Sequence, residues 1–317
     1  MTSSLPLVEV FILSYNRPEY LLQAIDSVLG QTYPQLKIII SDNSSRDDVE
    51  QKIQSYTHKD KITYLRRRPT LPALAHFNTI FAEATSEYFM VFHDDDVMLP
   101  DAISKLVTAI IKNPALSAVG ANAFVLEDDQ FTKNIFDPML TEDRTLASSE
   151  ELADHYLDSS KGHVPFPSYL YRRSKIANLK MIFKEGQKHA DVSFLLKACK
   201  QGPFLWLKSP VMYYRRHMLN DSVTLDVAAI FSLCRFLLKN TETAYTEINL
   251  YKMKNYILWA KQRRQNKSQP LTPWRDRILM RSAFVYLVRH PKILVRAILK
   301  RLAHRLHTHQ QPPNSPK

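Results

Sequence analysis

The stretch Tyr88-Phe89-Met90-Val91-Phe92-His93-Asp94-Asp95-Asp96 joins five apolar residues to a histidine and three adjacent carboxylates. Its apolar part has the length and the β-forming residues of a buried strand. Carboxylates are rarely buried without a partner, so three of them at a strand end need a physical reason. One reason is a divalent cation, which carboxylate oxygens bind together with the phosphates of a substrate. The other is a solvated turn, because aspartate is common in loops.

Strand-like and helix-like segments alternate before this stretch. Apolar runs predict strands at 8–13, 36–40, 62–65 and 88–92, and helical spacing predicts helices at 19–29, 49–56 and 74–84. Such alternation is typical of a mostly parallel sheet with helices on both faces, in which ligands bind beyond the carboxyl ends of the strands. Three of those ends carry polar residues, namely 14–17, 41–47 and 93–96.

The segments after residue 100 continue this domain. The pattern predicts a helix at 102–112, a strand at 118–126, a strand after 165–171, a helix at 191–200, a strand at 204–214 and mainly helix over 220–265. The acidic segment 127–150 has no clear period, and we expect an irregular loop over a site.

The length, the cysteine count and the net charge limit the classes of protein to which the chain can belong. The 317 residues can bury a sizeable core, and two cysteines argue against a disulfide framework or a cysteine-rich metal site. The net charge of +12 suits nucleic acid, anionic lipid or phosphorylated substrates alike. Neither a signal-peptide pattern nor an apolar run of about 18 residues occurs, so we expect a cytoplasmic protein.

Three motifs carry a resemblance to a known family. They are Phe11-Ile12-Leu13-Ser14-Tyr15-Asn16-Arg17, Ser41-Asp42-Asn43-Ser44-Ser45-Arg46-Asp47 and Phe92-His93-Asp94-Asp95-Asp96, in this order. The chain resembles the family-two glycosyltransferases, which are inverting enzymes that use nucleotide-diphosphate sugars. The resemblance covers about the first 220 residues. It implies the α/β fold named GT-A, a Rossmann-like, mostly parallel sheet flanked by helices, followed here by an α-helical C-terminal extension.

The resemblance also implies which residues bind the donor. Ser14 and Arg17 would border the nucleotide, and Arg66 falls where the family often has a basic nucleotide contact. Asp42 matches the acid that hydrogen-bonds the nucleobase. A carboxylate can accept from the imide N–H that uracil has and cytosine lacks, so a UDP-linked sugar is the expected donor.

The acidic run would bind Mg²⁺ or Mn²⁺ and the donor's ribose. By the resemblance, the metal lies on Asp95 first and Asp94 second, and Asp94 also touches the donor. Asp96 is either a supporting ligand or an outward turn residue. Many relatives have an acid in place of His93. Because imidazole is a poorer Mg²⁺ ligand than carboxylate, we expect His93 to lie outside the ligand set.

Asp191 is the predicted catalytic base. Direct displacement at an anomeric carbon needs a base for the acceptor hydroxyl, and the resemblance places an aspartate at the start of a helix in this part of the domain. Relatives often have glutamate where this chain has Ala190. A purely structural role as a helix N-cap or first-turn acid is the alternative for Asp191.

Tyr214-Arg215-Arg216-His217 resembles the family's Tyr-Arg-x-His segment. Arg215 and His217 would bind the diphosphate or complete the metal site. The alternative for the two arginines is an ordinary pair of surface charges at the end of a strand.

The C-terminal third lies outside the resemblance. We predict a transferase domain at 1–222, a helical extension at 223–265, a linker at 266–274, a basic amphipathic helix at 275–307 and a disordered tail at 308–317. Basic residues every fourth position from Lys292, opposite an apolar face, suit an anionic membrane surface, where a lipid-linked saccharide acceptor would be found. Packing of the apolar face on protein is the alternative.

The expected function is metal-dependent sugar transfer to a saccharide or lipid-linked saccharide in cell-surface polysaccharide assembly, including lipopolysaccharide. A nucleotidyltransferase would share the fold but would usually show a glycine-rich phosphate loop, and the chain has five glycines, none in that arrangement. The hypothesis of a nucleic-acid-binding protein is supported by the net charge alone, so nucleic acid is not an expected partner. An inactive scaffold is a further alternative because of His93 and Ala190.

Overall fold

A mixed β-sheet is the centre of residues 1–249 in the computed structural model, which describes residues 5–127, 129–158, 161–216, 226–243 and 245–265. Among these residues the sheet has the order β3-β2-β1-β4-β9-β6-β10-β5, with β7 on β6 and β8 on β10. The strands are β1 (Val8–Ser14), β2 (Leu36–Asp42), β3 (Thr63–Arg66), β4 (Tyr88–His93), β5 (Val97–Met98), β6 (Ala118–Glu127), β7 (Gln130–Ile135), β8 (Arg144–Leu146), β9 (Leu170–Arg172) and β10 (Phe204–Arg216).

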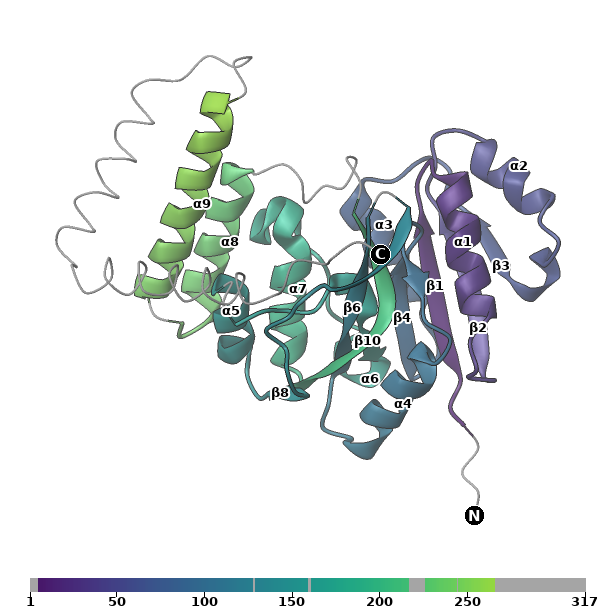
Figure 1. Ribbon diagram of the computed structural model, residues 1–317, viewed down its shortest axis with the longest axis horizontal. Helices are drawn as coiled ribbons and strands as arrows, with labels where there is room; N and C mark the ends of the chain where they lie inside the picture. Colours follow the sequence, from purple (N-terminus) through teal and green to yellow (C-terminus); the bar gives the residue numbers. More distant parts are fainter. Residues whose placement is uncertain (1–4, 128, 159–160, 217–225, 244, 266–317) are drawn as a thin grey trace, which may run out of the picture. The chain divides into compact units, whose positions relative to one another are not determined.

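The parallel part of the sheet brings the three polar segments to one edge. Strand β1 lies between β2 and β4 and is parallel to both (Figure 1). In register, Ser14 lies opposite Asp42, and Leu13 lies opposite His93. The residues that follow these strands therefore lie side by side, and the predicted α/β sheet is confirmed.

Helices cover both faces of the sheet. They are α1 (Pro18–Leu29), α2 (Asp48–Gln54), α3 (Ala73–Glu83), α4 (Ala102–Lys112), α5 (Ser149–Leu157), α6 (Arg173–Ile176), α7 (Ala190–Cys199) and α8 (Val227–Asn240). The buried sides of α1 and α4 pack on alternate residues of β1 and β4. On the other face, Phe81 of α3 stacks on Phe194 of α7 with ring centroids 4.4 Å apart, and both contact Tyr171 of β9. Successive residues of β1 and β4 thus pack on opposite faces of the sheet, and both faces of these strands are buried.

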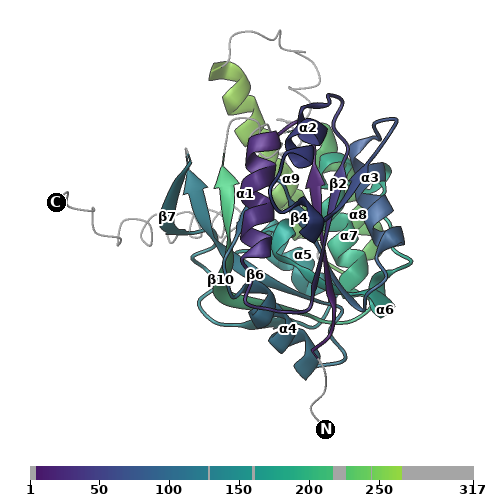
Figure 2. The same cartoon turned by 90° about the vertical axis from the view of Figure 1, so that its right-hand side faces the viewer.

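The segment 127–150 is not the irregular loop that its composition suggested. Strand β7 pairs antiparallel with β6 (Figure 2). Strand β8 pairs antiparallel with β10. The ring of Phe131 packs on Tyr213, with centroids 4.7 Å apart. The prediction was wrong because these short strands are held by main-chain pairing, β7 to the strand just before it and β8 to the distant β10, and an acidic composition does not reveal such pairing.

The chain divides into two units, residues 1–249 and 250–317. Helix α9 (Tyr245–Gln265) runs across the division, and residues 250–265 are the part of the second unit that the structure describes. The helices predicted within 220–265 are confirmed where the structure describes them. The predicted linker, basic helix and tail lie outside the described residues, and the predicted domain boundaries stay predictions. No helix in the described ranges has the length and apolarity needed to cross a bilayer.

Candidate active site

The acidic turn of residues 94–96 follows β4 directly and is buried. Asp94 is held from two sides, because its Oδ2 accepts a hydrogen bond from the Tyr15 N–H at 3.0 Å and its Oδ1 pairs with Arg17 at 2.6 Å. A second nitrogen of the same guanidinium lies 2.6 Å from Asp95 Oδ2. The structure therefore brings the predicted residues Arg17, Asp94 and Asp95 together, with the buried Ser14 at the end of β1 beside them.

Burial disfavours the charged forms of these acids. It raises the pKa of Asp94 to about 7, although Arg17 and the Tyr15 N–H act in the opposite direction. Burial and the neighbouring charge of Asp95 also raise the pKa of Asp96 well above its usual range. The two carboxylates raise the pKa of Arg17 against the effect of its own burial. The raised pKa values show that the single guanidinium partner does not offset the cost of ionising these buried acids, and a further cation at the turn would favour their charged forms.

The donor atoms of the turn fit a divalent cation. One ligand atom each from His93, Asp95 and Asp96 lie within 4.8 Å of one another. Asp96 Oδ2 is buried and has no hydrogen-bond partner among the described residues, which excludes an outward turn residue. Burial lowers the pKa of His93, so that its imidazole is neutral and able to ligate. The structure therefore places His93 and Asp96 beside the predicted ligand Asp95, whereas Asp94 faces Tyr15 and Arg17.

Arg215 is hydrogen-bonded to the acidic turn. Its side chain is 2% exposed, so the alternative of a surface charge does not hold. The Arg215 N–H donates to Asp96 Oδ1 at 2.9 Å, and Nε donates to the carbonyl oxygen of Asp95 at 2.6 Å. The guanidinium also donates to Gln23, pairs with Asp129 and lies over the Tyr20 ring, so its contacts are with protein groups. His217, predicted beside it, lies outside the described residues.

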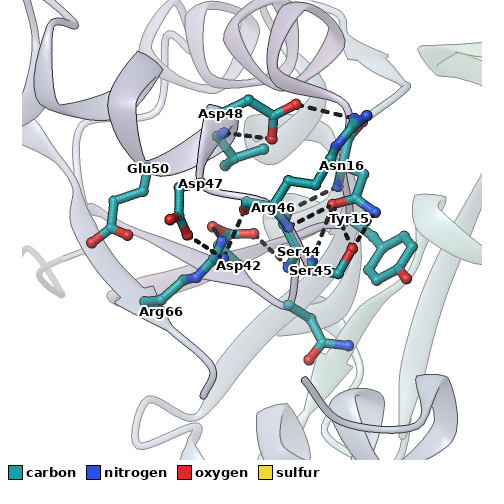
Figure 3. Close-up of polar contacts among 12 residues, drawn as sticks. Tyr15, Asn16, Asp42, Ser44, Ser45, Arg46, Asp47, Asp48, Glu50 and Arg66 are labelled. Carbon is teal, nitrogen blue, oxygen red and sulfur yellow. Dashed lines mark hydrogen bonds and ion pairs between the residues drawn. The ribbon is translucent and has the colours of Figure 1, made fainter. Parts of the chain in front are cut away.

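Asp42 organises the end of β2 (Figure 3). Its carboxylate is fully buried, and Oδ1 accepts from the Ser44 N–H at 2.8 Å. Oδ2 accepts from the Tyr64 hydroxyl at 2.6 Å and from the Arg66 guanidinium. Arg66 also donates to the Arg46 carbonyl at 2.7 Å. Two of the predicted nucleotide contacts, Asp42 and Arg66, are therefore bonded to each other, and their contact with a base stays a prediction.

Asn16 joins the loops after β1 and β2. Its φ of 56° lies in the left-handed region, which asparagine tolerates better than most residues. The Asn16 N–H donates to Ser44 Oγ at 2.7 Å, and Asn16 Oδ1 accepts from the Ser45 N–H at 3.0 Å (Figure 3). Arg46 in turn donates to the Asn16 carbonyl at 3.1 Å. Our sequence analysis missed this role, and the signal available was an asparagine shortly before the proline that begins α1.

Asp191 lies in the first turn of α7, after the 3₁₀ turn η4 (Gln187–His189). His189 occupies the N-cap position, so Asp191 is a first-turn acid rather than the cap. Its Oδ1 is buried and has no hydrogen-bond partner within the described ranges. Burial raises the pKa of Asp191 to about 6, partly offset by backbone N–H groups. This value suits a group that takes up a proton near neutral pH.

The segment from η2 (Phe166–Ser168) to β9 connects the surroundings of Asp191 with the acidic turn. The Phe166 ring stacks beside His93, with centroids 6.2 Å apart. Further along the segment, burial raises the pKa values of Tyr169 and Tyr171, and the nearby charge of Asp191 adds a smaller effect in the same direction. The base candidate and the cation candidate thus share one short run of the chain as a neighbour.

Asp42→Asn is expected to destabilise the protein by about 3 kcal/mol, because it leaves the guanidinium of Arg66 buried without its carboxylate. Asp47→Asn is the matched control, since Asp47 is exposed and its pairs with Arg66 and Arg68 are of the weak surface kind. Urea unfolding of both variants measures the difference. Equal stabilities of the two variants would show that Asp42 does not hold the loop.

Several known proteins are similar to this chain in sequence. A glycosyltransferase of Haemophilus influenzae without a characterised function is 25% identical over 232 residues, which is 72% of this chain and 83% of the relative. A second such protein of that organism is 30% identical over 117 residues, covering 37% of this chain and 36% of the relative. Another relative, Protein CgeD of Bacillus subtilis, is 29% identical over 119 residues, with 35% of this chain and 28% of its own length covered. The chain thus spans about a third of the length of these last two relatives.

Solved structures share the fold. TarS residues 1–349 of S. aureus superpose with a TM-score of 0.60 at 14% identity, over 87% of this chain and 78% of that chain. Mannosyltransferase PcManGT of Pyrobaculum calidifontis, in complex with GDP-Man and Mn²⁺, has a TM-score of 0.55 at 15% identity, over 95% and 88% of the two chains. The fold is therefore that of the GT-A glycosyltransferases. Residues 9–179, a little over half of the chain, match the model of the family described as glycosyl transferase family 2, and the chain belongs to this family.

Proposed function

We propose that the protein is a metal-dependent inverting glycosyltransferase that moves a sugar from a UDP-linked donor to a hydroxyl of an acceptor. The observation that carries the proposal is the buried acidic turn, in which Asp95 and the unsatisfied oxygen of Asp96 lie within reach of one ion. A TarS structure holds UDP-GlcNAc and the PcManGT structure holds GDP-Man with Mn²⁺, which supports a nucleotide-sugar donor for this fold.

Two groups of residues have separate roles in the proposed reaction: the acidic turn with Arg17 acts on the donor, and Asp191 acts on the acceptor. Asp95 and Asp96, with His93 beside them, would hold the cation, and Arg17 offers a planar guanidinium to the diphosphate oxygens. A bound Mg²⁺ or Mn²⁺ would supply positive charge to the departing diphosphate. Asp191 takes the proton of the acceptor hydroxyl as that oxygen attacks the anomeric carbon from the face opposite the leaving group. A single displacement of this kind inverts the anomeric configuration.

The proposed acceptor is a saccharide or lipid-linked saccharide of cell-surface polysaccharide assembly. The support is the sequence of residues 275–307, which places basic residues opposite apolar ones. Such a segment suits the anionic inner face of a plasma membrane, where a lipid-linked acceptor is presented.

A panel of nucleotide sugars tests the proposal. UDP-, GDP- and dTDP-linked sugars are incubated with the full chain and Mn²⁺ or Mg²⁺, and binding and slow hydrolysis are measured with EDTA as the control. We expect UDP-linked donors to bind and hydrolyse only with the metal. If no donor binds or hydrolyses, with or without a cation, the proposed function is rejected.

The reaction should depend on pH through Asp191. The base must be ionised to accept a proton, and burial raises the pKa of Asp191 to about 6. We therefore expect kcat to fall by up to about tenfold per pH unit as the pH drops below about 6, and to be constant above that value. The measurement is a profile of kcat with saturating donor, because the titration of Asp94 then affects the donor KM instead. A kcat that does not change between about pH 5 and pH 7 would contradict Asp191 as the base.

A further inference from the structure

Arg17 forms an ion pair with two adjacent acids and still reaches solvent. Its side chain is 29% exposed, whereas the side chains of Asp94 and Asp95 are 0% and 12% exposed. Both nitrogen–oxygen distances are 2.6 Å, so the planar guanidinium spans the two carboxylates. The exposed part of this side chain is accessible to a ligand.

Asp95 belongs to two sets of contacts at once. It is the partner of Arg17, and it is also a member of the cluster with His93 and Asp96 that fits a divalent cation. A cation at Asp95 would share this carboxylate with a guanidinium of like charge, and the two repel. Arg17 therefore lowers the affinity of the acidic turn for a cation.

Asp94 gives Arg17 a fixed second contact. The Tyr15 N–H holds Asp94 Oδ2 at 3.0 Å, while Asp94 Oδ1 pairs with Arg17. The guanidinium can thus leave Asp95 while keeping Asp94. A diphosphate offers the released nitrogen atoms new charged acceptors, because arginine forms paired hydrogen bonds with phosphate as well as with carboxylate.

We propose that Arg17 makes cation binding at Asp95 conditional on a diphosphate, so that the metal and the nucleotide bind as a coupled pair. This rests on the proposed function and adds to it a coupling between the two ligands. Arg17 opposes the cation alone, and once phosphate oxygens attract its guanidinium, that opposition is relieved. Because coupling between two ligands is reciprocal, the cation raises the affinity for the diphosphate by the same factor.

Mn²⁺ titration of Arg17→Gln tests the proposal, with free Mn²⁺ measured by electron paramagnetic resonance, in the presence and absence of UDP. The substitution removes the competing charge and the phosphate contact together. We expect the variant to bind Mn²⁺ alone about tenfold more tightly than the wild type, and to bind UDP more weakly. The factor by which UDP improves Mn²⁺ affinity should be smaller in the variant. These effects have opposite signs, which a general loss of structure does not produce.

Two further variants serve as controls. Lys52→Gln also removes one positive charge, from a lysine of α2 that pairs with Glu19 at 3.0 Å, and should leave Mn²⁺ affinity unchanged. Arg17→Lys keeps the charge without the planar fork and should give an intermediate Mn²⁺ affinity.

An Arg17→Gln protein with wild-type or weaker Mn²⁺ affinity overturns the proposal. These titrations contain no sugar. They therefore test the competition between Arg17 and the cation for Asp95 independently of sugar transfer. Transfer by the wild type with unchanged Mn²⁺ affinity in the variant would keep the function and reject the role of Arg17.

Discussion

Asp95→Ala is expected to abolish metal-dependent binding of the donor. Asp95 is the one predicted ligand that also lies in the cation cluster of the described residues, and its loss leaves His93 and Asp96 as donor atoms. It also frees Arg17 to pair with Asp94 alone. Contacts of a metal with phosphoryl oxygens are worth several kcal/mol, so we expect the affinity for a UDP-sugar in Mn²⁺ to fall by about 100-fold or more. Calorimetric titration with and without Mn²⁺ measures this loss.

Asp101→Ala is the matched control for this substitution. Asp101 lies just beyond the turn, is exposed and pairs with Lys105 at 2.9 Å, so its loss removes an acid without touching the cluster. Its donor affinity and its response to Mn²⁺ should equal those of the wild type. Asp95→Ala protein that is folded and still binds donor more tightly with Mn²⁺ than with EDTA would remove Asp95 from the site.

Asp191→Asn is expected to keep donor binding and lose turnover. The amide has nearly the same shape as the carboxylate and cannot accept the acceptor's proton. Loss of a general base typically costs about 10²- to 10⁴-fold in rate, and we expect kcat to fall within that range. Because the substitution replaces a buried carboxyl whose Oδ1 has no hydrogen-bond partner among the described residues, we expect little effect on stability. Measurement of kcat beside the donor dissociation constant separates the two roles.

Asp154→Asn provides the comparison on an exposed residue, since its carboxylate makes a surface pair with Lys161 at 3.6 Å. Its kcat and donor affinity should match those of the wild type. A purely structural role for Asp191, as a first-turn acid that favours the helix, predicts lower stability of the Asn variant with normal kcat. That result would assign the base to another residue.

The sheet could be predicted from the sequence because its central strands are uninterrupted apolar runs. Residues 8–13, 36–40 and 88–92 are such runs, and parallel pairing alone then brings the polar segments after them to one edge. The antiparallel strands β7 and β8 could not be predicted in this way. They are short and polar, and their stability comes from pairing with β6 and β10.

The contacts within the site were less predictable than the residues that make it. Residue types and strand ends indicated the three polar segments, and the family resemblance indicated Arg17, Asp42 and Asp95 within them. Neither indicated that Asp42 is enclosed by Tyr64 and Arg66. Such bonds depend on side-chain directions after β2 and β3 have paired. Asn16 was missed for a related reason, since its role depends on a left-handed backbone conformation that no periodicity reveals.

The position of Arg215 has a consequence for biosynthesis. This residue is 119 positions after Asp96, to which its N–H is bonded, and 120 positions after Asp95. During translation the aspartates leave the ribosome long before the arginine that orients them. A nascent chain that stops before β10 therefore lacks the two hydrogen bonds by which Arg215 holds Asp95 and Asp96, and the acidic turn gains them only when residue 215 has been synthesised.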